Sequence, residues 1–262
     1  MHSQLWAIAR YTLLEHLRGR MAVSALFVLT AALILSRLLD GVAVTEAAAL
    51  QATLTGAWLR LAMVILLSSA IIVSQVREAG DRTRDWLLAF PMPRSVWLGG
   101  RLLGHAAAAG LLALCAMLPL LGTAGVAGTL LWGAGLCLEL LVCTCMAVFL
   151  SISLTQAPAA LLGLAGWYLL SRSMAALQLV AAAPLLDDGT AFMHLSPWVL
   201  KGIAFLLPRF DLLSQGTDLS RGALGLATVT AWAALPALAL QMLVYAGLLV
   251  CASQVDLARR EW

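Results

Sequence analysis

The chain has very little charge for its length. Only 11% of its 262 residues are charged, and lysine occurs once, at Lys201. A soluble domain has about 25% charged residues, so this composition cannot make a water-soluble surface. Hydrophobic residues make up 62% of the chain, and the mean hydropathy is +0.95. The composition therefore predicts an integral membrane protein, and a net charge of +3, explained by loop arginines, gives no reason to expect nucleic-acid binding.

The sequence motifs of several catalytic and metal-binding classes are also missing. There is no Gly-x-x-x-x-Gly-Lys-Ser/Thr sequence to hold the phosphates of ATP. Neither Gly-x-Ser-x-Gly nor His-Glu-x-x-His occurs, which argues against a serine hydrolase or a zinc protease within the membrane. No Cys-x-x-Cys is present, so neither a zinc site nor a redox pair is indicated. We therefore expect no catalytic residue, metal or cofactor in the chain itself.

The cysteines and histidines are dispersed along the chain. They lie at Cys115, Cys137, Cys143, Cys145, Cys251, His2, His16, His105 and His194. Cys143 and Cys145 with Met146 are soft side chains that would suit Cu(I). Free cysteine also packs as a small apolar side chain, and this is the interpretation that we favour.

Six segments have the length and apolar character of membrane-spanning helices, which need about 20 residues to cross roughly 30 Å of hydrocarbon. They are approximately 21–39, 54–75, 97–122, 126–153, 159–186 and 224–253. Pro236 is expected to kink the last one. The pattern predicts an all-α membrane protein in which residues 21–262 form a six-span transmembrane domain.

The first twenty residues form a separate element. Leu5, Ala9, Leu13 and Leu17 recur every four residues, which predicts an amphipathic helix. The polar residues that fall largely on its other side are Gln4, Thr12, Glu15, His16 and Arg18. We expect residues 1–20 to lie along the membrane surface as an elbow helix, with Trp6 and Tyr11 at headgroup level, before Gly19 permits a bend into the first span.

The distribution of basic residues predicts the orientation. With both termini inside, ten arginines lie on the cytoplasmic side and four basic residues outside, which favours an N-in, C-in topology. The outer segment 187–223 is too apolar for an ordinary loop and is interrupted by Pro197 and Pro208. We expect short re-entrant or interfacial helices there. A seventh span through 191–207 is the alternative, and it would place the C-terminus outside.

A charged stretch, residues 76–96, separates the second and third predicted spans. Its members include Arg77, Glu78, Asp81, Arg82, Arg84, Asp85 and Arg94. Short basic loops are retained on the cytoplasmic side during insertion. The stretch also contains an amphipathic Trp86-Leu87-Leu88 segment, and Pro91 and Pro93 end it. A loop with this internal order is suited to docking on a partner protein.

With these features the chain resembles the permease subunits of ABC exporters of the ABC-2 class, which have the type V exporter fold. The resemblance covers the whole length: an elbow helix, six spans, a coupling loop after the second span and short re-entrant helices before the sixth. The loop motif of the family corresponds here to Glu78, Arg82-Thr83, Leu87-Leu88-x-x-Pro91, Arg94 and Gly100-Arg101. Arg82 stands where glycine is usual, and Arg101 where lysine is common. The Leu206-Leu207-Pro208-Arg209-Phe210-Asp211 run is similar to one in permeases grouped with copper-enzyme maturation systems.

The resemblance implies a permease of the bacterial inner membrane whose ATP and Mg²⁺ are bound by a separate ATPase subunit, present in two copies. The residues that would couple to that ATPase are Glu78, Arg82, Thr83, Asp85, Trp86, Leu87, Leu88, Pro91 and Arg94. The other expected partners are a second permease copy in a homodimer, membrane lipids and, in one interpretation, a periplasmic accessory protein. In that alternative, the chain transports nothing and passes ATPase-driven motion to a periplasmic or membrane assembly factor. An intramembrane enzyme is a third hypothesis.

Three charges fall inside predicted spans. Glu139 and Arg172 lie near the middle of the fourth and fifth spans. An unpaired charge at that depth costs about 2.5–3.5 kcal/mol, so we expect the two to pair within the bundle, with contact to a polar substrate or another subunit as the alternative. Arg60 lies about one and a half turns inside the second span, and we expect it to reach the outer headgroups.

Overall fold

The chain folds into a bundle of long helices. The computed structural model describes residues 2–40, 47–81, 92–182, 191–211, 213 and 225–259, and every regular element in these ranges is helical. The elements are α1 (His2–Arg18), α2 (Arg20–Asp40), α3 (Ala47–Gly80), α5 (Arg94–Met117), the short 3-10 turn η1 (Leu118–Leu120), α6 (Leu121–Ser153), α7 (Ala157–Ala182), α8 (Ala191–Leu206) and α10 (Gly225–Arg259). The predicted all-α architecture is confirmed for the described residues.

Five helical stretches among the described residues are long and apolar enough to cross a membrane. They are Arg20–Leu38, Gln51–Gly80, Arg94–Ser153, Ala157–Leu179 and Trp232–Arg259. The chain therefore has the helices of a multi-pass membrane protein. The third stretch is 60 residues long, and it contains both α5 and α6.

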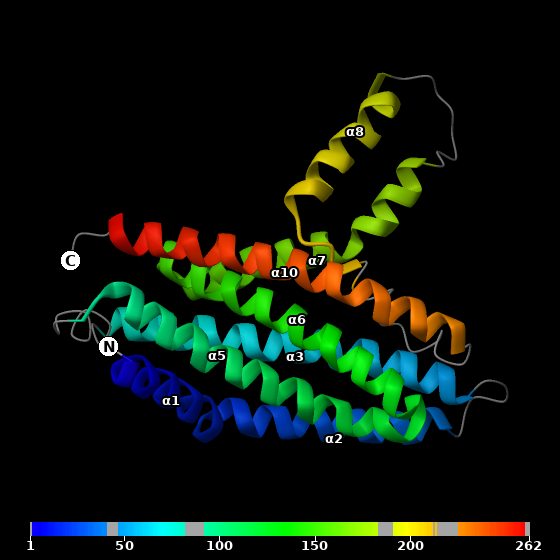
Figure 1. The fold of residues 1–262 in the computed structure, drawn as a ribbon, viewed down its shortest axis with the longest axis horizontal. Coiled ribbons are helices and arrows are strands. Elements are labelled where there is room, and N and C mark those ends of the chain that lie inside the picture. The colour runs from blue at the N-terminus through cyan, green and yellow to red at the C-terminus, as the bar shows by residue number, and fades with distance from the viewer. Residues whose placement is uncertain are drawn as a thin grey trace.

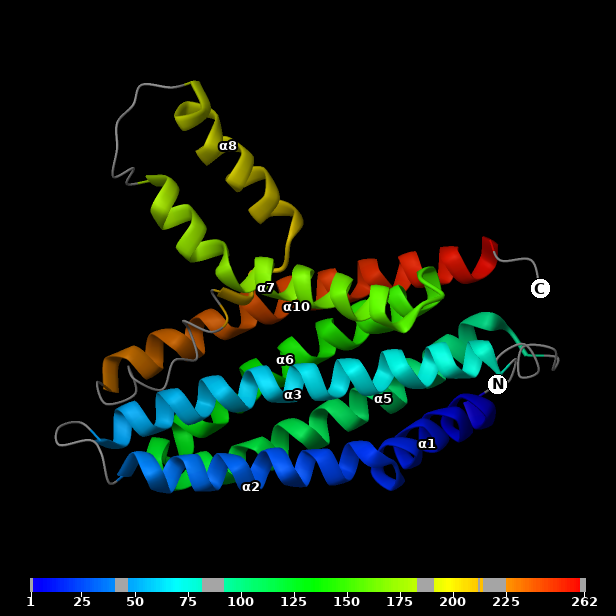
Figure 2. The ribbon, with the colours of Figure 1, turned by 180° about the vertical axis from the view of Figure 1, so that it is seen from behind.

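The long third stretch folds back on itself. A Cβ atom added at Gly133 would collide with the side chain of Met117, although these residues would lie about 24 Å apart along an unbroken helix. The chain reverses through η1 and at Gly125, whose φ of 69° is a conformation that glycine adopts without the steric cost of a Cβ. As a result α5 and α6 pack side by side, as both views of the fold show (Figures 1 and 2).

Helix α6 lies at the centre of the bundle. It packs against α3, α5, α7 and α10, and apolar residues lie all around it, as expected for a helix buried on every side. Leu136, Leu140 and Val148 are completely buried. The outer helices instead present exposed apolar side chains, such as Phe27 on α2 and Leu240 on α10, as a lipid-facing surface requires.

Both termini lie at the same end of the bundle, beside the end of α3 and the start of α5 (Figure 1). We call this the terminal end. Gly19 separates α1 from α2, as expected. Helix α8 and the last turns of α7 project away from the bundle in both views (Figures 1 and 2).

The structure differs from the sequence-based expectation in several helix boundaries. Helix α8 continues through Pro197, where a break was expected, and ends before Pro208. Proline inside a helix removes one backbone hydrogen bond and clashes with a carbonyl of the preceding turn, which kinks some helices and ends others. Helix α10 continues through Pro236 and extends to Arg259, beyond the expected boundary at 253. The expected end of the fifth span at 186 lies outside the described residues, as does most of the segment between α8 and α10.

Candidate functional site

The predicted coupling loop is described only at its two edges. Glu78 lies on the last turns of α3 and Arg94 is the first residue of α5. The other predicted coupling residues lie outside the described residues: Arg82, Thr83, Asp85, Trp86, Leu87, Leu88 and Pro91. The contacts of Glu78 and Arg94 therefore show how the loop is attached to the bundle.

Arg94 attaches the start of α5 to the end of α10. Its Nη1 donates to the carbonyl oxygens of Leu257 at 2.9 Å and Ala258 at 3.3 Å. Carbonyl oxygens in the last turn of a helix receive no hydrogen bond from within the helix, so they are available to Arg94. A cation at this position is also attracted to the negative end of the helix dipole. The Ser153 hydroxyl, at the end of α6, donates to Asp256 in the same turn. The end of α10 is thus held by both α5 and α6.

Arg101 joins three helices on the inner side of the loop. Its side chain is 3% exposed and forms ion pairs with Glu15 of α1, at 3.1 Å, and with Glu78 of α3. The guanidinium also lies 5.9 Å from the centre of the Trp97 ring, an arrangement in which a cation is attracted to the face of the ring. We call Arg101 with Glu15 and Glu78 the Arg101 junction. It binds α1, α3 and α5 together beside the coupling loop.

A glycine seam brings α1 close enough to α5 for this junction to form. A Cβ atom at Gly104 would lie 2.7 Å from the carbonyl oxygen of Ala9, and one at Gly100 would lie 3.0 Å from the carbonyl oxygen of Leu5. Because these contacts involve the backbone of α1, side chains at either position would push the helices apart. Helix α1, the predicted elbow helix, is therefore packed directly on α5.

A buried polar chain continues from α1 into the bundle. His16 Nε2 lies 2.7 Å from His105 Nδ1, and His105 Nε2 lies 3.3 Å from Gln75 Nε2. Ser151 on α6 donates to Gln75 Oε1 at 2.8 Å. The Gln75 amide group therefore donates to His105, which in turn donates from Nδ1 to His16. This chain connects α1, α5, α3 and α6.

The position of His16 corrects the expectation from sequence. His16 and Thr12 were expected on the polar side of the elbow helix, yet they are only 3% and 0% exposed. They face α5 because the glycine seam leaves room there for polar side chains that find partners. Burial lowers the pKa of His16; the neighbouring carboxylate of Glu15 raises it, and Arg101 lowers it again.

A second buried cluster lies deeper in the bundle, around Glu139 of α6. The Glu139 carboxylate is 0% exposed and accepts hydrogen bonds from Arg60 at 3.0 Å, Tyr168 at 2.7 Å and Arg172 at 3.3 Å. The expected pair of Glu139 and Arg172 is present. We call these four residues the Glu139 cluster, which joins α3, α6 and α7.

The placement of Arg60 corrects another expectation. Its side chain is only 3% exposed and points to Glu139, not to outer headgroups. Its guanidinium also lies 5.5 Å from the centre of the Trp132 ring on α6. A carboxylate and an aromatic face at the same depth outweigh the advantage of reaching the membrane surface. Nothing in the sequence pattern around Arg60 indicated that it shares the acid with Arg172.

The Arg209-Phe210-Asp211 segment packs against this cluster through Phe210. Phe210 is completely buried and meets Trp167 edge-on at 5.5 Å and Tyr168 at 5.7 Å. Asp211 accepts from Nε and Nη2 of Arg209, at distances between 3.0 and 3.3 Å. Phe210 therefore connects the segment after α8 to the tyrosine that holds Glu139.

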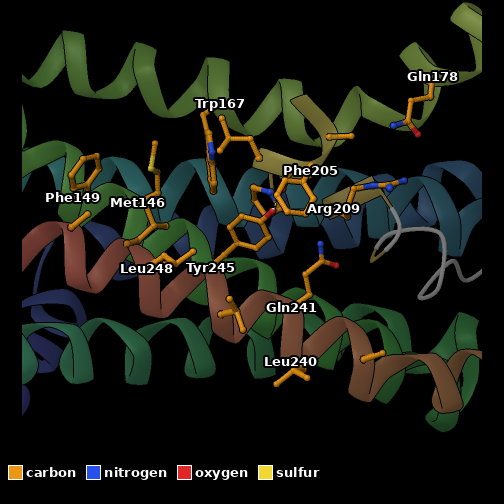
Figure 3. A pocket seen from close by; sticks show the side chains of 17 residues that line it. Met146, Phe149, Trp167, Gln178, Phe205, Arg209, Leu240, Gln241, Tyr245 and Leu248 are labelled. Carbon is orange, nitrogen blue, oxygen red and sulfur yellow. Dashed lines mark hydrogen bonds between the residues drawn. The ribbon is translucent and has the colours of Figure 1, made fainter. Parts of the chain in front are cut away.

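A large groove opens between α6, α7 and α10, next to the same segment. Its volume is about 1050 Å³, at the upper end of the range for ligand sites, roughly 300–1,000 Å³. Figure 3 shows Trp167 and Tyr245 in its centre, with Met146, Phe149 and Leu248 on one side. The Tyr245 hydroxyl lies 2.8 Å from the Phe205 carbonyl and 3.0 Å from that of Leu207, which fixes the end of α8 at the groove.

No protein-family model matches the chain, and no curated protein matches it.

The main features missed from the sequence are contacts between distant residues. His16 and His105 are 89 positions apart and Arg60 and Glu139 are 79 apart. The sequence did contain one indication of this packing, the glycines Gly100 and Gly104. They predict that another helix packs closely at this position, but they do not show which helix it is. Within the described residues, no group of three or more His, Cys, Asp or Glu side chains is arranged to hold a metal ion.

Proposed function

We propose that this chain is the membrane-spanning permease subunit of an ABC exporter that resembles the ABC-2 class. A separate ATPase subunit would hydrolyse ATP, and this chain would convert the resulting motion into export or extraction of a substrate across the bacterial inner membrane. The observation that carries the proposal is the attachment of the charged loop. Its two edges are bonded through Glu78, Arg94 and Arg101 to α1, α3, α5 and α10.

Six crossings with both termini inside fit this role. Helices α2, α3, α5, α6, α7 and α10 supply the crossings, with α5 and α6 forming a hairpin. An even number of crossings agrees with both termini lying at one end (Figure 1). Trp6 and Tyr11 are 70% and 64% exposed on α1, where an elbow helix would place them among lipid headgroups.

The contacts provide a mechanical route from the loop to the bundle. A partner that pushes on the loop moves the start of α5, and Arg94 transmits that displacement to the end of α10. Arg101 transmits it to α1 and α3. Charge-assisted hydrogen bonds are short and directional, so they transmit a displacement with little slack. A second permease copy would complete the transport path, and a homodimer is the default arrangement.

The proposal is tested by purifying the tagged chain from native membranes in mild detergent and measuring the bound ATPase subunit and its ATP hydrolysis. We expect Asp85→Lys and Trp86→Ala to lose the ATPase while the permease remains inserted and folded. Trp232→Ala, an exposed tryptophan on α10, is the matched control and should retain it. Absence of any ATPase from the wild-type preparation, or equal amounts with all variants, would refute the proposal.

One observation favours the second candidate, a membrane partner that drives a periplasmic assembly factor. Helix α8 and the last turns of α7 project from the bundle (Figure 2), and Trp198 and Phe205 are 74% and 87% exposed on α8. A projecting apolar hairpin is a suitable contact for an accessory protein. Recovery of a periplasmic protein with the complex, and its loss after Trp198→Ala, would support this candidate.

A further inference from the structure

The groove between α6, α7 and α10 has a polar end and an apolar end. Figure 3 shows Arg209 and Gln241 on one side of Tyr245, with Gln178 farther out on α7, whereas Phe149, Met146 and Leu248 lie on the other side. Along α10 its lining runs from Ala237 to Ala252, a length of about 22 Å. A site with this shape and polarity matches an amphiphile with a compact head and one long apolar chain.

The polar end carries hydrogen-bond donors. Asp211 uses Nε and Nη2 of Arg209, and its side chain is only 2% exposed. Nη1 of Arg209 takes no part in that pair, and the Arg209 side chain is 24% exposed. The Gln241 amide is hydrogen-bonded to the Tyr245 hydroxyl and keeps a second N–H donor. Gln178 adds another amide to the lining, from α7. Such a set suits a head rich in acceptor oxygens, such as a phosphate or a carboxylate.

The depth of the polar end excludes a phospholipid in its resting position. Gln241 lies near the middle of α10, about 24 Å from its first residue, Gly225, and about 27 Å from its last, Arg259. It is therefore far from both ends of a helix that is longer than the roughly 30 Å hydrocarbon thickness. A resident phospholipid keeps its head at the membrane surface, so only its acyl chain would lie against the polar side chains of Arg209 and Gln241. The groove instead fits an amphiphile whose head has moved into the membrane.

The groove is also connected to the Glu139 cluster. Trp167 forms part of its wall and contacts Phe210, which in turn contacts Tyr168. Tyr168 donates to Glu139 at 2.7 Å. An occupant that displaces Trp167 or Phe210 therefore shifts a side chain on which the buried carboxylate depends.

We infer that this groove binds the transported molecule, and that this molecule is a single-chain amphiphile with a phosphate or carboxylate head. Its head meets Arg209 and Gln241, and its chain extends along α10 past Leu248 towards Ala252. That the bound molecule is transported rests on the proposed export function. That the groove binds such a molecule does not depend on the export function.

The test uses an oleoyl lysophosphatidylglycerol that carries a diazirine near the end of its chain. The full chain is placed in phosphatidylcholine nanodiscs, photolysed and analysed by peptide mass spectrometry. We expect labelling of α10 between Leu248 and Ala252, and competition by unlabelled lysophosphatidylglycerol and by oleate. Competition by both would show that either acidic head is accepted, and competition by one alone would identify the preferred head.

Matched tryptophan substitutions separate the groove from the general lipid surface. Val244 lines the groove and Leu243 does not, although their exposures are nearly equal at 55% and 53%. Val244→Trp should reduce the labelling at least fivefold, and Leu243→Trp should leave it unchanged. Gln241→Leu keeps the side-chain size but removes the amide, and it should weaken competition several-fold, which provides a second test if Val244→Trp folds poorly.

Two results would overturn the inference. One is equal labelling in the wild type and in all three variants, which would mean that the probe reports only lipid at the surface. The other is loss of the dimer with Val244→Trp in the absence of any probe, which would mean that a second copy of the chain fills the groove. Recovery of the ATPase, measured separately, tests the export proposal. Labelling of the groove without any bound ATPase would support the binding site but refute the transport role.

Discussion

The Glu139 cluster and the Arg101 junction have opposite compositions. In the first, one carboxylate is shared by the guanidinium groups of Arg60 and Arg172. In the second, one guanidinium is shared by Glu15 and Glu78. Each cluster joins three helices, but the shared group is an acid at membrane depth and a base at the terminal end.

The carboxylates of the two clusters also differ in their exposure to solvent. Glu139 is 0% exposed, so it has no access to water if a partner is lost. Glu15 and Glu78 are 30% and 16% exposed and can be rehydrated. Breaking a buried ion pair leaves an uncompensated charge, whereas a partly exposed pair loses less. The Glu139 cluster therefore fixes the packing of α3, α6 and α7, and we expect the Arg101 junction, beside the predicted coupling loop, to rearrange at a lower cost.

The largest effect is expected at the acid of the Glu139 cluster. Glu139→Gln leaves two guanidinium groups without their carboxylate, and we expect a loss of about 3–5 kcal/mol in stability. The yield of folded protein and its thermal unfolding midpoint, measured by fluorescence-detected size-exclusion chromatography, should both fall. A variant that folds at the wild-type level and loses only transport would indicate a substrate contact in place of a structural pair.

Double substitutions distinguish the two arginines. In Glu139→Gln/Arg172→Gln the stranded cation is Arg60, which is 3% exposed, whereas in Glu139→Gln/Arg60→Gln it is Arg172, which is 29% exposed. Because Arg172 has access to a more polar environment, the variant that removes Arg60 should recover more of the unfolding midpoint. Equal or additive losses in both double variants would contradict a shared ion pair.

A smaller effect is expected at the Arg101 junction. Arg101→Gln removes the partner of two acids that are partly exposed, and we expect a loss of about 1–3 kcal/mol. Arg101→Lys keeps the charge but not the planar fork, so an intermediate loss is expected. A cysteine placed at Ala9, which is 7% exposed, should react faster with a maleimide as α1 separates from α5.

The control for this variant is Arg77→Gln, because the Arg77 side chain is 82% exposed and its contact with Asp81 is 3.9 Å long. It should change neither the stability nor the cysteine reactivity. An unchanged reaction rate in Arg101→Gln would show that the glycine seam alone holds α1 in place.

The smallest effect is a pH dependence at His16. Burial lowers the pKa of His16 in the folded protein, so the unfolded chain binds a proton first as the pH falls below about 6.5. Stability is therefore complete above that pH and decreases below it, until the folded protein also binds the proton. The groups that face His16 are Glu15, Arg101 and His105.

Thermal unfolding midpoints between pH 7.5 and 5.5 test this expectation. The wild type should lose stability as the pH falls, and His16→Gln should lose less. A glutamine at this position still accepts the hydrogen bond from His105. A steeper pH dependence in the variant would contradict the assigned direction of the pKa shift.

Much of the helical fold could be predicted because apolar length is a local property. Each predicted span from 21–39 to 126–153 lies mainly in one observed helix, although 97–122 also includes η1 and the first residues of α6. The reversal at Gly125 falls between the third and fourth predicted spans. The continuation of α8 through Pro197 was not predicted, because proline affects one hydrogen bond and the remaining turns hold the helix together. The topology and the coupling role remain predictions.

The sequence by itself determined the class of protein, because too few charges are present to cover a soluble surface, and it located Glu139 and Arg172 within spans. Only the tertiary structure decided that Arg60 also binds Glu139, that His16 meets His105, and that Arg101 holds two acids. These contacts depend on the rotation of each helix about its axis. The rotation is set by packing against helices far away in the chain, at places such as Gly100 and Gly104, and no local pattern records it.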